Sequence, residues 1–368
     1  MAEDINYLLK CIECGADFFT KGERNFYNSK GLNMPKRCKA CRDKRKSRYD
    51  QAQKERGREE ILSTSPFKQI EKTEMALTDP NTTLFIIGNG FDLMHGVQSS
   101  YYNFRDTLGK NNPLRFALET YLNVEDLWAD FEDALAHIDS GAMFGVVDMW
   151  IDDFAAYDPD AQAADFFLAV DAATGPAQTI TNELPRRFRM WVESLKVPDI
   201  AYRPLDGVIR NSKTLNFNYT EFIEKLYDVD KGNVCYIHGC RRKEKYHPKD
   251  KLIIGHIPGA GDSGLVGDYS LPRYKSSRKQ EMVEAGIETA ARNLSWYDDE
   301  TTKYCKDIIT NHQGFFDGLS NIRKIIVIGH SLSIVDWDYF KEIIRVNKDK
   351  KNIEWLISYH SPRDIENC

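Results

Sequence analysis

Leu84-Phe85-Ile86-Ile87-Gly88-Asn89-Gly90-Phe91-Asp92 carries the clearest structural signal in this chain. Four apolar residues run straight into a glycine turn, and a segment with helical character begins near residue 100. This order of strand, tight turn and helix places backbone N–H groups and a helix N-terminus where a phosphate group can bind. The same order also occurs where a strand turns sharply onto a helix without any ligand, so the turn alone leaves both interpretations open.

Other short apolar runs in the chain have the character of this first strand. Continuous runs of this length are typical of parallel strands that are covered on both faces. Segments with helical character separate them, and this alternation predicts an α/β fold with a doubly wound, Rossmann-like, mostly parallel sheet and a helical insertion at about residues 110–200. The expected strands are 84–87, 214–217, 234–237, 252–254, 325–328 and 353–358, and the expected helices are about 100–109, 114–138, 144–156, 160–196, 220–228, 278–292, 300–318 and 335–345.

Polar residues gather where these predicted strands end. Ligands of parallel α/β sheets bind beyond the carboxyl ends of the strands. We therefore expect the side chains at these ends to lie near one another and to form a ligand site. They are Asn89, Asp92, Asn218, His238, His256, His330 and Ser331.

Several of these residues also have a purely structural interpretation. Asn218 could cap the helix that follows it, and His238 could bond a backbone carbonyl in a turn. Asp92 could cap a turn, and His330-Ser331 could begin a helix. The sequence leaves both interpretations of each residue open.

Two further sets of residues predict packing and no separate site. Trp128 and Glu132 have the i, i+4 spacing of a packed aromatic ring and its surface neighbour. Four cysteines outside the N-terminal region show no metal-site spacing and are expected to be ordinary thiols. They are Cys235, Cys240, Cys305 and Cys368.

Four cysteines near the N-terminus have the spacing of a zinc site. Cys11-x-x-Cys14 and Cys38-x-x-Cys41 form two knuckles, each able to direct two thiolates at one tetrahedral ion. Four sulfur ligands leave no open coordination position, so we expect a structural zinc that stabilises a segment too small for a hydrophobic core. A redox pair is the alternative. The segment from Cys11 to Arg42 resembles small zinc-ribbon domains of bacterial proteins, which supports the metal but assigns no task.

Charge is unevenly distributed along the chain. The net charge is −6, yet residues 36–58 hold eleven lysines and arginines against three acids, which gives +8 there and leaves −14 for the rest. A basic arm on an acidic body can contact nucleic acid, and a solvated helix between two modules is the alternative. We expect a zinc-ribbon domain at 1–46, a partly helical charged linker at 47–80 and an α/β domain at 81–368.

Length and composition exclude several classes of protein. A chain of 368 residues that is 42% hydrophobic suits one large α/β core with a small accessory module. No apolar run approaches the ~20 residues that span a bilayer, and the N-terminus lacks the pattern of a secretory signal. Eight cysteines in a chain of this size do not indicate a disulfide scaffold. We therefore expect a cytoplasmic protein with no membrane partner.

A set of motifs in the α/β region resembles a known family. In chain order the motifs are Ile87-Gly88-Asn89-Gly90-Phe91-Asp92-Leu93, Trp128-x-x-Phe131-Glu132, Asn216-Phe217-Asn218-Tyr219-Thr220, Ile237-His238-Gly239 and Ile328-Gly329-His330-Ser331-Leu332-Ser333-x-x-Asp336. The set resembles the AbiH family of bacterial phage abortive-infection proteins over roughly residues 82–360. This resemblance implies a role in antiviral defence, with a homo-oligomer or a larger defence complex as the expected assembly.

A more distant resemblance, to sirtuin-like domains, implies a chemistry. Asn218-Tyr219, His238-Gly239 and Gly329-His330-Ser331-Leu332 match motifs of those domains in the same order. In defence proteins such domains commonly cleave NAD at the nicotinamide–ribose bond, so the resemblance implies an NAD glycohydrolase. The chain departs from them at Thr220, where they carry Asp, and in the first glycine loop, which lacks their Ala and the Ser after it.

The implied reaction assigns roles to these residues. Cleavage of the N-glycosidic bond develops positive charge on the ribose. His238 would act as general base, Asn218 would orient a water or the ribose hydroxyls, and Asp92 would bond a ribose hydroxyl or stabilise the developing charge. The nucleotide would be bound by Gly88, Asn89, Gly90, Phe91, Gly329, His330, Ser331 and Asp336, where Asp336 alternatively caps the last helix.

Two other functions also fit the sequence. The zinc ribbon and the basic arm could bind nucleic acid while the α/β body acts as a nuclease, although the sequence shows no compact carboxylate cluster at metal-ligand spacing. The chain could instead be a noncatalytic nucleotide sensor in a defence complex. The zinc ribbon could equally bind a protein partner.

Overall fold

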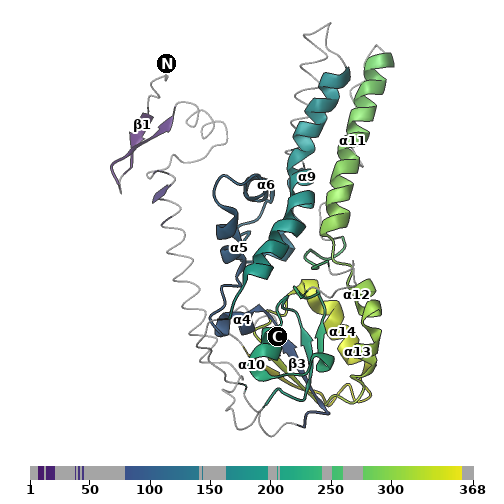
Figure 1. Ribbon diagram of the computed structural model, residues 1–368. Coiled ribbons are helices and arrows are strands. Elements are labelled where there is room, and N and C mark those ends of the chain that lie inside the picture. The colour runs from purple at the N-terminus through teal and green to yellow at the C-terminus, as the bar shows by residue number, and fades with distance from the viewer. Residues whose placement is uncertain are drawn as a thin grey trace. The chain divides into compact units, whose positions relative to one another are not determined.

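The structure shown in Figure 1 is a computed structural model, and it describes residues 7–11, 14–20, 38, 40–41, 44, 79–140, 143, 163–197, 205, 208–242, 251–259 and 277–358. Contacts divide the chain into two compact units, Met1–Gln69 with Ser361–Glu366, and Ile70–His360 with Asn367–Cys368. The predicted helix at 144–156 and nearly all of the predicted linker at 47–80 lie outside the described residues. The division into 1–46, 47–80 and 81–368 therefore stays a prediction.

The larger unit contains a five-stranded sheet whose strands all run in the same direction. The spatial order is β5-β4-β3-β6-β7, so the first strand to enter this sheet is central. β4 and β5 follow β3 in the chain and lie on one side of it, whereas β6 and β7 come later and lie on its other side. The strand order therefore reverses between β3 and β6, and the carboxyl ends of these two strands form the topological switch point. The strands are β3 (Thr83–Ile87), β4 (Lys213–Asn216), β5 (Val234–Tyr236), β6 (Lys324–Ile328) and β7 (Glu354–Ile357).

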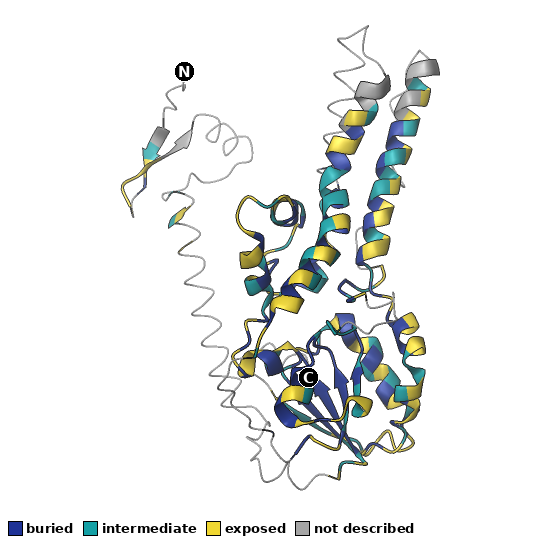
Figure 2. Ribbon diagram, in the orientation of Figure 1, coloured by how far each residue is buried: buried dark blue, intermediate teal, exposed yellow. Residues whose placement is uncertain are grey.

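Both faces of this sheet are covered. Along β3, Phe85 and Ile87 belong to one hydrophobic core, whereas Leu84 and Ile86 belong to a second core. Successive side chains of a strand point to opposite faces, so a strand covered on both sides needs a continuous apolar run. All four side chains are fully buried, and Figure 2 shows this central strand in dark blue. The prediction of a parallel α/β sheet is confirmed; its assignment as Rossmann-like or sirtuin-like stays a prediction.

Helices lie on both sides of the sheet and between the strands of the chain. α10 (Phe222–Tyr227) packs into the first core, while α12 (Cys305–Asn311), α13 (Gln313–Asp317) and α14 (Trp337–Val346) pack into the second. The connection from β3 to β4 carries four further short helices; the last two fall within the predicted helical insertion at about residues 110–200, and the first two precede it. They are α4 (Asn89–Met94), α5 (Tyr101–Leu108), α6 (Pro113–Tyr121) and α7 (Phe131–Ala134).

Several expected elements differ from the structure. The predicted helix 114–138 is divided into two short helices by the non-helical residues 122–130, and the predicted helix 300–318 is divided into α12 and α13. The run 252–254 is not a strand, although Ile253 N–H donates to the His238 carbonyl oxygen at 2.9 Å. The run is apolar because Leu252 and Ile254 pack into the first core, beside the edge of the sheet. The first helix after β3 begins at Asn89, directly beyond the glycine turn, and not near residue 100.

A pair of long helices extends from the α/β layers (Figure 1). They are α9 (Ala163–Ser194) and α11 (Ser277–Thr301). Asn293 donates a hydrogen bond to the Thr174 hydroxyl at 2.9 Å, and further along both helices Glu300 and Thr181 line the same pocket. Moving toward the carboxyl end of one helix therefore also moves toward the carboxyl end of the other, so the two helices run parallel. No helix among the described residues is long and apolar enough to cross a bilayer.

The smaller unit contains an antiparallel hairpin of β1 (Tyr7–Lys10) and β2 (Asp17–Thr20). The turn between the strands carries the first cysteine pair. Gly15 has a φ of +73° and donates its N–H to the Cys11 carbonyl oxygen at 2.9 Å. This left-handed conformation suits glycine and closes the Cys-x-x-Cys knuckle.

At the switch point the turns that follow β3 and β6 are in direct backbone contact, with no side chain between them. Gly88 N–H donates to the Ile328 carbonyl oxygen at 2.9 Å, and Gly90 N–H donates to the Gly329 carbonyl oxygen at 2.8 Å. A Cβ atom on Gly88 would lie 2.5 Å from the Gly329 carbonyl oxygen and 2.5 Å from the His330 Cα. Glycine is therefore needed because two turns approach more closely than any side chain allows.

We predict that Gly88→Ala lowers the free energy of unfolding by about 3 kcal/mol or more, because both clashing groups are backbone atoms that cannot rotate away. Gly314→Ala is the matched control, since a Cβ at Gly314 meets nothing within 4 Å. That control should change stability by less than about 1 kcal/mol. Denaturant unfolding of the two variants measures both values, and equal stability would contradict the steric argument.

Candidate functional site

The carboxyl ends of four neighbouring strands bring polar side chains together in the interior. Asp92 follows β3, Asn218 follows β4, His238 follows β5 and His330 follows β6. Their exposed fractions are 2%, 6%, 2% and 6%. Buried polar groups are costly unless they are hydrogen-bonded. The bonds of these side chains therefore define what the edge of the sheet can do.

Asp92 is the centre of a first network. Asn218 Nδ2 donates to Asp92 Oδ1 at 3.1 Å and to the Gly88 carbonyl oxygen at 3.0 Å. The Thr220 hydroxyl donates to Asp92 Oδ2 at 2.7 Å. Asn218 is held in place by its own N–H, which donates to Asn216 Oδ1 at 2.9 Å. The Asn-x-Asn-x-Thr segment after β4 therefore fixes the carboxyl group that follows β3.

Burial controls the protonation of Asp92. Removal from water raises the pKa of Asp92 from 3.8 to about 7, while the hydrogen bonds from Thr220 and Asn218 oppose the rise. The group therefore changes charge near neutral pH. Such a carboxyl group can donate a proton or accept one under physiological conditions.

His330 and Asp336 form the start of a second network. Leu332 N–H donates to His330 Nδ1 at 2.9 Å, so the ring proton is assigned to His330 Nε2. That nitrogen lies 3.3 Å from Asp336 Oδ2. The turn that makes this geometry has left-handed residues at both ends, Gly329 with φ +63° and Leu332 with φ +54°. A leucine in this conformation is strained, and strain of this kind is concentrated at functional sites.

His238 joins the same network from β5. Its Nε2 lies 3.2 Å from the Tyr339 hydroxyl and 3.5 Å from Asp336 Oδ1. Burial holds the pKa of His238 well below its usual range, and the positive charge of Lys303 acts in the same direction. The imidazole is therefore neutral at pH 7, as a general base must be.

Lys303 is the cation of this network. Its side chain is completely buried, and Nζ lies 3.1 Å from Asp336 Oδ1 and in contact with Glu132 Oε2. Glu132 Oε1 accepts a hydrogen bond from the Tyr101 hydroxyl at 2.8 Å. Burial favours a neutral amine, but the charges of Asp336 and Glu132 outweigh it and raise the pKa of Lys303. One ammonium group thus links two carboxylates from distant parts of the chain.

Residues with a predicted nucleotide-binding role are divided between exposed and buried positions. Asn89 and Ser331 are exposed, and Gly90 and Gly329 are partly exposed, whereas Phe91 is buried. The N–H groups of Gly88 and Gly90 are already bonded to the turn after β6, so they are not free for a phosphate in this conformation. Their role in binding stays a prediction.

The structure decides several of the structural alternatives. Asn218 does not cap α10, whose N-cap is Glu221. His238 bonds side chains and not a turn carbonyl. Asp92 lies within the first turn of α4, and its carboxyl oxygens reach across to β4. Glu132 is not a surface neighbour of Trp128, because its carboxyl group is directed to Lys303 and Tyr101.

Lys303 and Tyr339 are the site residues that sequence reasoning missed. Lys303 lies in the polar segment between α11 and α12, and Tyr339 lies in a helix with an ordinary amphipathic pattern. Neither has a motif or a spacing that distinguishes it. Glu132 was detectable only through its place in the Trp-x-x-Phe-Glu motif.

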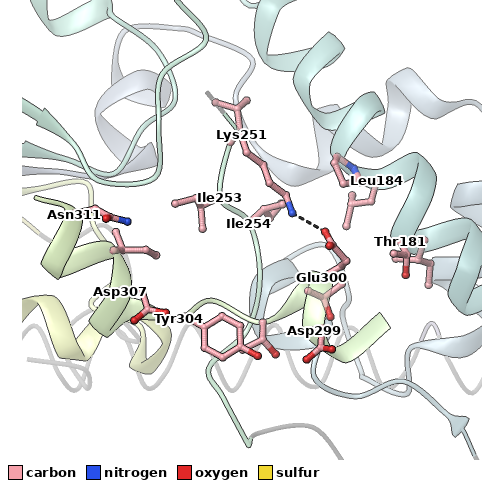
Figure 3. Close-up of a pocket in the computed structure, with 16 residues that line it drawn as sticks. Thr181, Leu184, Lys251, Ile253, Ile254, Asp299, Glu300, Tyr304, Asp307 and Asn311 are labelled. Atoms are coloured by element: carbon pink, nitrogen blue, oxygen red, sulfur yellow. Dashed lines mark hydrogen bonds and ion pairs between the residues drawn. The ribbon is translucent and has the colours of Figure 1, made fainter. Parts of the chain in front are cut away.

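Figure 3 shows a pocket of about 270 Å³ whose lining includes Lys251, Ile253, Glu300 and Tyr304. Lys251 and Glu300 form an ion pair in its wall, with 2.6 Å between Nζ and Oε2. None of the predicted site residues lines it. Its lining nevertheless touches the network, because Ile253 N–H bonds the His238 carbonyl oxygen, and Thr302 and Tyr304 flank Lys303.

The smaller unit brings its four predicted cysteines together. The sulfur atoms of Cys11, Cys14, Cys38 and Cys41 lie within 4.8 Å of one another, and those of Cys14 and Cys38 are 3.7 Å apart. Tetrahedral zinc with bonds of about 2.3 Å requires sulfur atoms about 3.8 Å apart. Hydrogen bonding with Cys14 and Cys38 raises the pKa of the Cys41 thiol, so thiolate ligands at this position need a cation to compensate their charge. The residues fit a structural zinc.

Together these features define an α/β protein with a buried polar network at the carboxyl edge of a parallel sheet and a separate four-cysteine unit. Residues 84–359 match the family model described as "Bacteriophage abortive infection AbiH", and the chain belongs to this family. Residues 4–50 match the model described as "Probable treble clef domain". No curated protein and no solved structure matches the chain. The family implies a role in phage abortive infection, while the resemblance to sirtuin-like domains stays a prediction.

We predict that the purified protein contains about one zinc ion per chain and that Cys41→Ser removes it, because a closed tetrahedral site cannot lose a ligand without a large loss of affinity. Cys240→Ser is the matched control, since Cys240 lies outside the cluster. Elemental analysis of the three proteins measures the ratio. Retention of zinc by Cys41→Ser would contradict the assignment.

A second prediction follows from the raised pKa of Asp92. The folded state binds this proton more tightly than the unfolded state, so the stabilisation is fully present below about pH 4 and is lost as the pH rises through 7. Asp92→Asn mimics the protonated group and cannot ionise. The advantage of the wild type over Asp92→Asn in free energy of unfolding should therefore fall by roughly 4 kcal/mol between pH 4 and 8.

Denaturant titrations at several pH values measure this difference. Asp338→Asn, at a half-buried carboxyl group paired with Lys341, is the control for removing one negative charge. A constant difference between the wild type and Asp92→Asn across this range would show that Asp92 does not titrate there.

Proposed function

We propose that this protein is an abortive-infection effector that binds a nucleotide at the carboxyl edge of its sheet and hydrolyses NAD at the nicotinamide–ribose bond. One observation carries the proposal: neighbouring strands deliver Asp92, Asn218 and His238 to this edge next to the topological switch point. Ligands of parallel α/β sheets bind at this position. The membership in a phage-defence family supplies the biological setting.

The proposed reaction uses groups whose protonation suits it. Loss of nicotinamide leaves positive charge on the ribose, and water must then add to the sugar. His238 is neutral and takes a proton from that water. Asn218 orients the water or the ribose hydroxyls, and Asp92 in its ionised form stabilises the positive charge. The site has to open for this step, since the described conformation buries all three side chains.

Binding of the nucleotide depends on the two turns at the switch point. Asn89 and Ser331 are exposed there and can donate hydrogen bonds to a phosphate or a ribose. Gly90 and Gly329 lie beside them, where both are partly exposed and pack against each other through backbone atoms. Asp336 and His330 act from the interior, because they bond each other and Asp336 also pairs with Lys303. We therefore propose that the nucleotide binds at the exposed rim of the two turns, which is formed by Asn89, Gly90, Gly329 and Ser331.

A noncatalytic nucleotide sensor is the second candidate. The specific observation that favours it is that the predicted catalytic groups already have hydrogen-bond partners within the protein: Asn218 bonds Asp92, and His238 bonds Tyr339. A ligand at the rim could then stabilise the domain without reacting. The nuclease alternative gains less support, because the carboxylates of Glu132 and Asp336 hold Lys303 between them.

We predict that His238→Ala abolishes NAD loss in cells that express the protein and are challenged with phage. Removal of a general base typically slows a reaction by about 10²–10⁴-fold. Metabolite profiling of infected cells measures NAD and nicotinamide. His137→Ala is the control, because that histidine is half-exposed and pairs only weakly with Asp133 at 3.7 Å.

The outcomes separate the candidates. Loss of NAD with release of nicotinamide in the wild type, but not in His238→Ala, supports hydrolysis. Unchanged NAD together with a higher melting temperature on addition of nucleotide supports the sensor. Intact NAD with cleaved RNA or DNA would favour the nuclease, and equal NAD loss in both proteins would remove His238 from the mechanism.

A further inference from the structure

The most unusual side chain in the described structure is Lys303. It is 0% exposed, and it is among the largest fully buried side chains of the described residues. A lysine is almost never fully buried unless it is paired. Its two partners, Glu132 and Asp336, come from segments 171 and 33 residues away in sequence. A buried charge held in this way needs an explanation beyond packing.

The contacts of Asp336 supply that explanation. Asp336 Oδ1 faces both Lys303 Nζ at 3.1 Å and His238 Nε2 at 3.5 Å, while Oδ2 faces His330 Nε2 at 3.3 Å. One carboxylate thus connects the ammonium group to both imidazoles. The ammonium group and His330 keep the pKa of Asp336 far below its usual range despite burial, so the carboxylate stays ionised.

We propose that Lys303 is a positioning residue: its ammonium group, held between Glu132 and Asp336, fixes the Asp336 carboxylate and through it the orientation and hydrogen-bonding roles of His238 and His330. The described hydrogen bonds and ion pairs of the Lys303 side chain reach Glu132 and Asp336, and none of them involves the turns after β3 and β6. Lys303 acts through Asp336, because a carboxylate that bonds a ring nitrogen fixes the orientation and tautomer of a histidine.

The chemistry of the histidines depends on this arrangement. The carboxylate of Asp336 favours protonation of His238, whereas the positive charge of Lys303 disfavours it. While Lys303 is charged, it therefore offsets much of the effect of Asp336 on the pKa of His238. His238 then remains neutral and can accept a proton. Without the ammonium group the carboxylate would attract a proton to the nearest imidazole, and a protonated imidazole cannot act as a base.

Other groups around His238 contribute less to this control. His330 and His312 oppose its protonation, as Lys303 does, whereas Asp336 favours it. The Tyr339 hydroxyl bonds its Nε2, and the rings of Phe217 and Tyr219 lie 5.3 and 6.3 Å from its own ring. Among these groups Lys303 is the fixed positive charge, since the histidines bear one only when protonated.

Lys303 also has a distinct place in the fold. It lies two residues beyond the end of α11 and two residues before α12, whereas Glu132 belongs to α7 and Asp336 precedes α14. Lys303 N–H donates to the His256 carbonyl oxygen at 2.7 Å, and His256 N–H donates to the Thr301 carbonyl oxygen at 2.9 Å. The backbone that carries the ammonium group is therefore held on both sides.

The test measures the titration of His238 directly and needs no turnover. Histidine side chains are labelled with ¹⁵N in the full chain, and the signals of His238 and His330 among the eight histidines are assigned with His238→Gln and His330→Gln. Lys303→Met and Lys303→Gln both remove the charge. Lys303→Gln retains a donor for the carboxylates, so it serves where Lys303→Met fails to fold.

We expect the titration midpoint of His238 to rise by about one pH unit or more in both variants, and the His330 tautomer to lose its preference for a proton on Nε2. Lys303→Arg keeps the charge and should keep the wild-type titration. Lys251→Met is the matched control, because Lys251 also pairs with a carboxylate, that of Glu300, but is 59% exposed. It should leave both histidine signals unchanged.

The inference rests on the proposed role of His238, and the two can fail separately. An unchanged His238 midpoint in folded Lys303→Gln overturns the role of Lys303, whatever reaction the protein performs. A shifted midpoint supports it. A shifted midpoint in a protein that leaves NAD intact in infected cells rejects the reaction and leaves the positioning role of Lys303 in place.

Discussion

The contact between the turns after β3 and β6 is the constraint on which the larger unit depends. Backbone atoms of Gly88 and Gly90 meet backbone atoms of Gly329 and His330, and two N–H groups cross from one turn to the other. This contact joins the two halves of the sheet at their carboxyl edge. It also sets the direction in which Asp92 and His330 leave their strands. Both polar networks therefore depend on the close approach of the same two turns.

Much of the fold could be predicted because the physics is local. Alternation of side chains along a strand requires apolar residues on both faces of a buried strand, and β3 shows this as four successive apolar residues. The same logic failed for 252–254, since an apolar run does not show whether a neighbouring strand is there to pair with it. The cysteine cluster could also be predicted from local sequence, because each Cys-x-x-Cys knuckle brings two thiols together and two knuckles place four thiols within reach of one ion.

The site was predictable only in part. Asp92, Asn218, His238 and His330 stand at strand ends, and parallel topology brings strand ends together whatever the loops do. Lys303 does not follow from this rule. Its burial depends on Glu132 and Asp336, which approach it only when α7, α11 and α14 have packed, and no spacing in the sequence encodes that meeting. The glycine turn was ambiguous for a related reason: glycine permits close approach, but the sequence does not show whether a phosphate or another turn approaches.

The parallel direction of α9 and α11 has an electrostatic consequence. Parallel helices place their macrodipoles side by side with like poles together, so both negative poles converge where the helices join the α/β layers. Neither helix has a basic residue in its last turn. A cation from elsewhere compensates at α9, where the Arg241 guanidinium donates to the carbonyl oxygens of Val192 and Leu195. Any displacement of the helical pair therefore separates opposite charges at its base.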